Sequence, residues 1–377
     1  MGRKGKLKVL CIFSRLLGGK TFSGRLIEAL SNIDEVTPLY LFYDLEDSQR
    51  YPVPRWAEMS DTLAASWSIR KKFRDAVKEE FDILCFQSYM LMPAFYELIK
   101  RLPTAVALDT TPALAHKLII EETNSPLVKV RSKIACYIST FIFKKIFGHV
   151  DIFLQRTQWC CDSLESDYDT GADKLYVTYS PLDLSIWKPI ERGTNGKMNL
   201  LFVGNDFKRK GGEFLLELYR RHLSDRCVLR IVSNDRNLSN MHIPNGVYII
   251  QGITHGEVDK LIDIYQTSDL FLFPTIRDQL GLVLTEAISV GLPVVANDVG
   301  GIRELVKDNW NGYLMPCESK VEEWAYKVKS LIENPDQLKR FGDNSRKLAE
   351  EKLVMAKFKD TVENAVKKLV GLAKKES

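Results

Sequence analysis

The sequence has no run of about 20 apolar residues, the length that a helix needs to cross a lipid bilayer. Its seven cysteines form no C-x-x-C pair, which argues against a zinc site or a dithiol redox motif. It contains no internal repeat and no low-complexity tract. The formal net charge is only +4, from 53 basic and 49 acidic residues, so charge does not favour a nucleic-acid partner. These absences predict a soluble, cytoplasmic globular protein with reduced cysteines and no metal.

The first residues are basic and then apolar, as in a secretory signal peptide. However, Arg15 interrupts the apolar run early, and no small-residue cleavage site follows it. A buried strand over residues 8–13 explains this segment better, and we therefore expect no cleaved leader.

Short apolar runs alternate with longer amphipathic segments along the whole chain, which is typical of α/β domains with parallel sheets. Residues 180–198 are rich in Pro, Gly, Ser and charge, a composition that fits an interdomain linker. We therefore predict two Rossmann-like doubly wound domains, residues 1–185 and 186–354, that face each other across a cleft. The last helix, about residues 355–377, is a candidate to pack back on the first domain. Strands are expected at 7–13, 36–43, 81–86, 104–109 and 150–155, and then at 198–204, 228–233, 247–252, 270–275 and 292–297.

Residues 271–305 carry the most informative pattern: a strand, a loop, and a helix that begins near Gly281. The free amides of Leu282 and Val283 would then point out of the helix N-terminus, which carries about half a positive charge and suits a diphosphate. Asp278 precedes the helix and could accept hydrogen bonds from sugar hydroxyls. Glu286 lies inside the helix and could bind the two hydroxyls of a ribose.

Ordinary structural roles would also account for these two carboxylates, with Asp278 as a helix N-cap and Glu286 as a solvated helix residue. Yet Glu286 lies between apolar residues, where an unpaired carboxylate is costly. We therefore expect Glu286 to have a partner.

A second informative segment is the basic loop after the strand at 198–204. It contains Arg209 and Lys210 directly before two glycines. A diphosphate leaving group gains negative charge in the transition state, so fixed cations here would be useful for catalysis. The alternative is a solvated turn that ends in a helix cap.

Together these segments resemble the donor site of family 4 glycosyltransferases. The resemblance rests on a carboxylate, seven residues and a Glu with Gly between them, then the GLPVVANDVGGIRE segment and NGYLMP, over about 45 residues. Asp278 stands where the family usually has Glu. Asn205 stands where the family has an Arg after the strand glycine, and Arg209 could substitute for it.

The resemblance implies a GT-B fold and a retaining, metal-independent transfer of a hexose, without a cofactor. The donor would be a nucleotide diphosphate sugar, UDP- or GDP-linked, and the acceptor a carbohydrate, a lipid-linked molecule or another compound. Arg209, Lys210 and the helix N-terminus at Gly281 would stabilise the leaving phosphate, Asp278 would orient the sugar, and Glu286 would bind the ribose. Two rivals stay open: a sugar-nucleotide epimerase with this fold, and an inactive binding protein.

The first half offers weaker candidates. Gly18 and Gly19 follow the first strand, where similar enzymes place a glycine loop against the donor or acceptor, although any strand–helix turn uses glycine. His116 follows the strand at 104–109 and is the nearest match to a family histidine that faces the transferred sugar; a structural histidine is the alternative. Residues 127–148 are basic and amphipathic, so they could contact an anionic membrane or pack on their own sheet.

Overall fold

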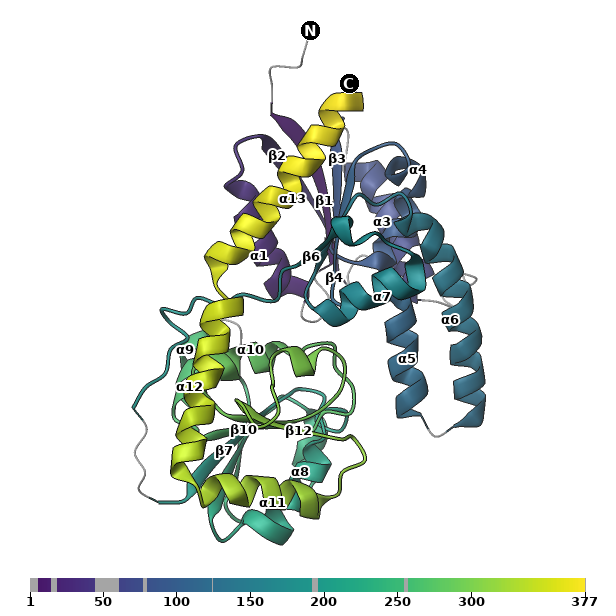
Figure 1. The fold of residues 1–377 in the computed structure, drawn as a ribbon. Helices are drawn as coiled ribbons and strands as arrows, with labels where there is room; N and C mark the ends of the chain where they lie inside the picture. The colour runs from purple at the N-terminus through teal and green to yellow at the C-terminus, as the bar shows by residue number, and fades with distance from the viewer. Residues whose placement is uncertain are drawn as a thin grey trace. The chain divides into compact units, whose positions relative to one another are not determined.

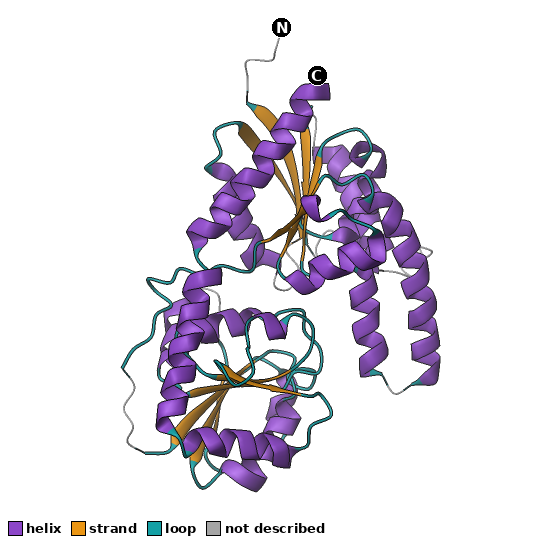
Figure 2. Ribbon diagram, viewed as in Figure 1, coloured by secondary structure: helices purple, strands orange, loops and turns teal. Residues whose placement is uncertain are grey.

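The computed structural model describes residues 6–14, 19–44, 61–76, 80–123, 125–191, 196–253 and 257–376. The chain divides into two compact units. Unit 1 contains residues 1–179 and 356–377, and unit 2 contains residues 180–355. In both units strands lie between layers of helices (Figure 2).

Unit 1 contains a six-stranded parallel sheet in the order β2-β1-β3-β4-β5-β6 (Figure 1). Its strands are β1 (Leu7–Ser14), β2 (Val36–Tyr43), β3 (Ile83–Phe86), β4 (Thr104–Leu108), β5 (Ile152–Gln155) and β6 (Leu175–Val177). Its α-helices are α1 (Gly19–Ser31), α3 (Asp61–Ala76), α4 (Tyr96–Ile99), α5 (Pro112–Glu122), α6 (Pro126–Phe147), α7 (Gln158–Tyr168) and α13 (Met355–Glu376).

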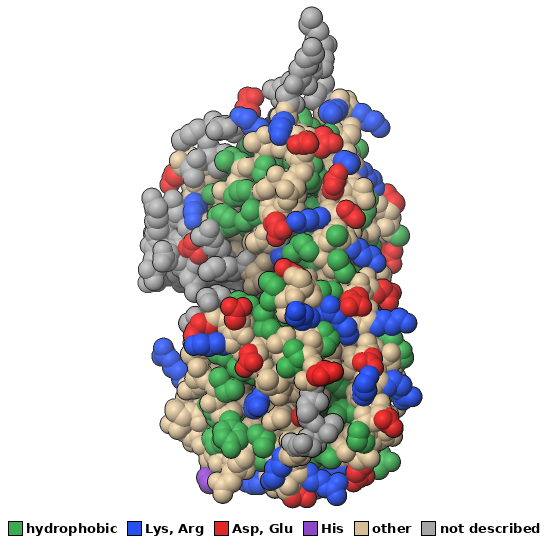
Figure 3. Space-filling model, turned by 90° about the vertical axis from the view of Figure 1, so that its left-hand side faces the viewer, with side chains coloured by type: hydrophobic (Ala, Val, Ile, Leu, Met, Phe, Trp, Pro, Cys, Tyr) green, Lys and Arg blue, Asp and Glu red, His purple; other side chains and the backbone are tan. Residues whose placement is uncertain are grey.

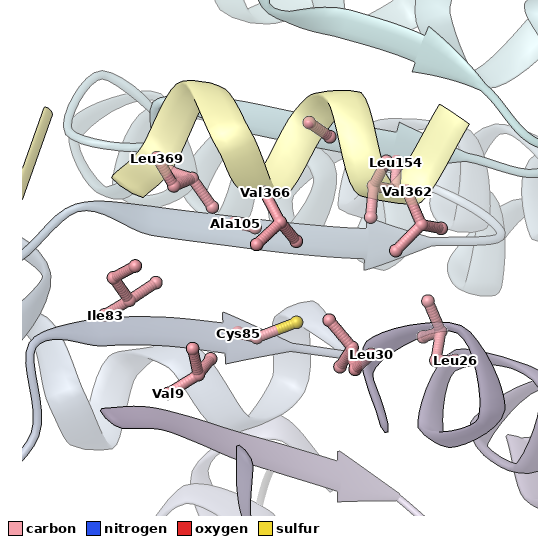
Figure 4. Close-up of a pocket in the computed structure, with 11 residues that line it drawn as sticks. Val9, Leu26, Leu30, Ile83, Cys85, Ala105, Leu154, Val362, Val366 and Leu369 are labelled. Carbon is pink, nitrogen blue, oxygen red and sulfur yellow. The ribbon is translucent and has the colours of Figure 1, made fainter. Parts of the chain in front are cut away.

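The central strands of unit 1 are apolar on both faces because helices cover both faces. One face packs against α3, the end of α6 and α7. The other packs against α1 and α13, whose Val362, Val366 and Leu369 point toward the strands (Figure 4). The space left between α13 and the sheet is about 10 Å³ and is lined by apolar side chains, which leaves no room for a substrate.

Unit 2 contains a second six-stranded parallel sheet in the order β12-β11-β10-β7-β8-β9. Its strands are β7 (Met198–Val203), β8 (Cys227–Val232), β9 (Val247–Ile250), β10 (Leu270–Phe273), β11 (Val294–Asn297) and β12 (Gly312–Met315). Its α-helices are α8 (Gly212–Leu218), α9 (Val258–Gln266), α10 (Leu282–Ser289), α11 (Val321–Ile332) and α12 (Pro335–Lys352).

The predicted fold class, two doubly wound parallel sheets, is confirmed, and every strand expected from the sequence is present. Two segments that lie between strands and have helical composition do not form regular α-helices over their whole length. The segment at 92–102 begins as a 3₁₀-helix, Tyr89–Phe95, because Pro93 lacks the amide for an α-helical hydrogen bond. The segment at 302–309 forms only the 3₁₀-helix Ile302–Glu304, because the Asn311 side chain bonds the Leu305 carbonyl and the Lys307 amide.

Residues 184–187, part of the predicted interdomain linker, pack on unit 2. Trp187 is buried, and its ring contacts the Tyr265 ring at 5.7 Å. Arg346 of α12 donates hydrogen bonds to the carbonyls of Leu184 and Trp187. These contacts place residues 184–187 against α9 and α12.

Candidate functional site

The candidate site lies where two neighbouring strands of unit 2 end. Strands β7 and β10 are parallel neighbours, with Leu200 opposite Leu270, so the loops after them meet at the carboxyl edge of the sheet. The chain goes from β7 to β8 and β9 on one side, and then returns to β10 on the other. Such a reversal of strand order is where open α/β sheets bind their ligands.

The two loops are in close backbone contact. Gly211 has φ +81°, and a Cβ there would lie 2.0 Å from the Pro274 carbonyl oxygen, so this position needs glycine. The Arg209 guanidinium donates to the Arg277 carbonyl at 2.6 Å and to the Asp206 carboxylate at 2.6 Å. Arg209 therefore joins the loop after β7 to the loop after β10.

Lys210 and Asp278 form an ion pair across these loops. Their side chains are only 14% and 8% exposed, respectively, so the pair is largely shielded from water. The Lys210 Nζ lies 5.0 Å from the centre of the Phe273 ring, and the other Asp278 oxygen accepts from the Gln279 amide at 2.9 Å. The site thus already holds a buried cation, with a carboxylate in the place that a ligand anion could take.

Helix α10 begins beside this pair. Its N-cap is Gly281, with φ +75°, and no side chain caps the helix. The amides of Leu282 and Val283, in the first turn, are left to a ligand or to water. The alternative that Asp278 is the N-cap of this helix is wrong.

Glu286 is half-buried in α10 and accepts a hydrogen bond from the Tyr265 hydroxyl at 2.8 Å. The expectation that this carboxylate has a partner is confirmed. Tyr265 is fully buried, and burial, followed by the Glu286 charge, raises its pKa well above the ordinary value, which keeps the hydroxyl a donor. We did not predict Tyr265, because it lies in α9 within an ordinary amphipathic pattern.

A third loop, after β11, supports Asp278. Gly300 has φ +56°, and a Cβ there would lie 2.2 Å from the Asp278 carbonyl oxygen. The Gly301 amide donates to the Gln279 carbonyl at 2.6 Å, and Asn297 Nδ2 donates to the Thr275 carbonyl at 3.1 Å. The double glycine therefore lets the β11 loop hold the backbone of the Asp278 loop.

The candidates of the first half lie in unit 1 and are described within that unit. Gly18 lies outside the described residues, and Gly19 is the first residue of α1. His116 lies in the second turn of α5, where burial lowers its pKa. At the ends of β4 and β5, Asp109 pairs with Arg156, a residue that we did not predict.

In the part of the chain that the structure describes, no group of three or more His, Cys, Asp or Glu side chains could hold a metal ion. All seven cysteines are free, and burial raises the pKa of the Cys227 thiol to about 12. Lysine, backbone amides and carboxylates are therefore the groups that the site offers to a ligand.

Comparison with known proteins gives a family match that lies within unit 2. Residues 186–348 match the family described as glycosyl transferases group 1. An uncharacterised glycosyltransferase of Methanocaldococcus jannaschii is 29% identical over 252 residues, 62% of this chain and 64% of that protein. The chain spans about half to two thirds of the length of the first curated relatives that it matches.

Solved structures with the same fold cover nearly the whole chain. Sucrose-phosphate synthase from Thermosynechococcus elongatus superimposes with a TM-score of 0.76 at 14% identity, over 97% of this chain and 100% of that one. The Anabaena protein HepE, solved in complex with UDP-glucose, gives a TM-score of 0.66 at 14% identity, over 96% of this chain and 100% of that one. Residues 186–348 are thus similar to the group 1 glycosyl transferases, and the chain has the GT-B fold.

Proposed function

We propose that this chain is a retaining, metal-independent glycosyltransferase that transfers a hexose from a nucleotide diphosphate sugar to an acceptor. One observation carries the proposal: a buried lysine–carboxylate pair and an uncapped helix N-terminus meet at the strand-order reversal of a group 1 sheet. Lysine and free amides bind phosphate, and a nearby carboxylate binds hydroxyls.

The donor would extend across the carboxyl edge of unit 2. We assign its diphosphate to Lys210 and the first-turn amides of α10, and its ribose to Glu286. The complex of HepE with UDP-glucose supports UDP-glucose as the first donor to test. Because Arg209 already donates to Asp206 and Arg277, we assign it to holding the two loops together.

In the transfer step, the bond between the anomeric carbon and the β-phosphate oxygen breaks, and the acceptor hydroxyl oxygen bonds to that carbon on the same face. The acceptor proton moves to the departing phosphate oxygen. Lys210 and the α10 amides stabilise the negative charge that develops there. Since Lys210 pairs with Asp278 in the ligand-free site, donor binding moves the lysine to phosphate and leaves Asp278 to accept from the sugar hydroxyls.

A thermal-shift screen against UDP-, GDP- and ADP-linked sugars tests donor binding. A donor at about a hundred times its dissociation constant should add close to 3 kcal/mol to the free energy of unfolding. Lys210→Ala should greatly reduce the shift, and Lys208→Ala, in the same loop but exposed, should keep it. No stabilisation by any of the three donor classes would overturn the proposal.

Turnover separates the alternatives. Release of nucleoside diphosphate that requires an acceptor and survives a chelator supports metal-independent transfer, and the anomeric configuration of the product tests retention. Conversion of the donor to another sugar nucleotide without an acceptor would indicate an epimerase. Donor binding without any turnover over a broad acceptor set would indicate a binding protein.

We also propose a cytoplasmic location with contact to a membrane surface. The seven free cysteines support a reducing compartment. No helix within the described ranges is long and apolar enough to cross a bilayer. Detection of the protein in the soluble and peripheral membrane fractions of its host cells tests the location.

A further inference from the structure

Helix α6 presents an apolar surface to solvent. The described residues include fifteen large hydrophobic side chains that are exposed, and eight of them lie on this one helix. We call these eight the α6 stripe: Leu127, Val128, Val130, Ile134, Tyr137, Ile138, Phe141 and Ile142. Their exposure runs from 39% for Val128 to 77% for Tyr137, so the alternative that the apolar residues of this helix pack on their own sheet is wrong for these eight, although it holds for Ile146.

The stripe is separate from the face that anchors the helix. Most of its members recur at intervals of three or four residues, which places them along one side of the helix. The anchoring residues Phe143, Ile146 and Phe147 are buried against the rest of unit 1. Helix α6 runs antiparallel to α5 at the edge of unit 1 (Figure 1). The stripe is therefore not needed to attach α6 to its unit.

The charge of α6 has one sign. Its 22 residues include five cations, Lys129, Arg131, Lys133, Lys144 and Lys145, and no Asp or Glu. Lys144 pairs with Asp169, and Lys145 lies 4.6 Å from the centre of the Phe141 ring, beside the stripe. Another face of the molecule shows the usual mixture of basic and acidic side chains (Figure 3).

Helix α13 provides an internal comparison, because it also has 22 residues and belongs to the same unit. Its apolar side chains, such as Val362 and Leu369, are buried on the sheet, and it carries Asp360 and Glu363 among its lysines. An amphipathic helix of this unit thus normally has its apolar face covered, and the α6 stripe is the exception.

We propose that the α6 stripe binds the surface of a membrane that contains anionic lipids. The apolar side chains would enter the boundary between headgroups and acyl chains, and the cations would contact the phosphates. A helix of 22 residues is about 33 Å long, so it can lie in the plane of the surface along its whole length. Protein partners are less suited to it, because lysine is depleted in protein–protein interfaces. This inference does not depend on the proposed transfer reaction.

Vesicle flotation with the full chain tests the proposal. The probes are vesicles of phosphatidylcholine alone and vesicles with about one third phosphatidylglycerol. We expect binding to the anionic vesicles at least tenfold stronger than to the neutral ones, and a weakening of at least tenfold at high salt, because headgroup attraction is screened.

Two pairs of variants identify the surface. Ile134→Glu with Ile138→Glu should reduce vesicle binding by tenfold or more, whereas Tyr248→Glu with Tyr326→Glu, at equally exposed positions of unit 2, should not. Lys129→Gln with Lys133→Gln should reduce binding about thirtyfold, at about 1 kcal/mol per charge. Lys260→Gln with Lys339→Gln is the matched control. Because the substituted side chains are exposed, apart from the half-buried Lys129, the thermal unfolding temperature should change little. The same measurement identifies any variant that fails to fold.

Three outcomes would overturn the proposal. The first is equal binding to neutral and anionic vesicles, and the second is binding that survives the Ile134 and Ile138 substitutions. The third is self-association of the chain that the same substitutions abolish, without vesicle binding, because a second copy would then cover the stripe.

Discussion

The two units share one architecture but differ at the carboxyl edges of their sheets. In unit 2 the largely buried Lys210–Asp278 ion pair lies at this edge, and its side chains are 14% and 8% exposed. In unit 1 an ion pair at the ends of β4 and β5 joins Arg156 to Asp109, and the Asp109 side chain is 44% exposed. The comparison supports the proposal that the edge of unit 2 binds a charged ligand, whereas the most unusual described surface of unit 1 is the outer face of α6.

The largest effect that we expect comes from Lys210→Ala. It removes the cation that faces the departing phosphate, so turnover should fall by roughly 10²–10³, as for the loss of an oxyanion donor. The measurement is steady-state turnover with the donor found in the thermal-shift screen. Lys208→Ala is the matched control, and near-normal turnover of Lys210→Ala would refute the role.

The next effect concerns stability and compares the two edges directly. Asp278→Ala leaves Lys210 buried without its carboxylate, so the free energy of unfolding should fall by about 3 kcal/mol. Asp109→Ala leaves Arg156, which is also 14% exposed, without its carboxylate, but water reaches this pair at the half-exposed Asp109, so the loss should be smaller than for Asp278→Ala. Urea denaturation measures both. Equal losses would mean that the two edges do not differ in the way that the structure indicates.

A smaller effect should follow from Tyr265→Phe, which removes the hydroxyl that orients Glu286. If Glu286 binds the ribose equally in the ground and transition states, KM for the donor should rise about tenfold with kcat unchanged. A loss of stability without any change in KM would assign Tyr265 to the core alone. Trp187→Phe, which alters one of the aromatic contacts of the Tyr265 ring, is a useful comparison.

The smallest effect should come from His116→Gln. Burial lowers the pKa of His116, so between that lowered pKa and the ordinary value of 6.5 the unfolded chain binds more protons than the folded one. Stability therefore rises with pH through this window and is lost as pH falls below 6.5. Thermal unfolding from pH 5 to 8 should show a weaker pH dependence in the variant. An unchanged pH dependence, combined with a fall in turnover, would favour a role for His116 at the sugar.

The fold could be predicted from the sequence because buried parallel strands are continuous apolar runs, such as 198–204 and 270–275, between amphipathic segments. Most of the candidate site could be predicted for the same reason: Lys210, Asp278 and Gly281 lie in the loops that follow such strands. The missing amide of Pro93 and the side-chain hydrogen bond of Asn311 prevent regular α-helices at these places. The apolar pattern of the sequence does not show either effect.

Tertiary partners could not be predicted either. Tyr265 reaches Glu286 from a helix 21 residues earlier, and Arg156 reaches Asp109 across 47 residues. Neither contact follows from spacing within one element. The exposure of the α6 stripe was equally hidden, because an apolar stripe at helical spacing has the same sequence whether it is covered or open.

The most direct test of the account is the preference of the protein for a nucleoside diphosphate over the corresponding monophosphate, measured by calorimetry. If Lys210 and the N-terminus of α10 bind the second phosphate, wild type and Lys208→Ala should both prefer the diphosphate. Lys210→Ala should lose most of that preference while its affinity for the monophosphate changes little. An undiminished preference in Lys210→Ala would contradict the assignment of the carboxyl edge of unit 2 as a diphosphate site.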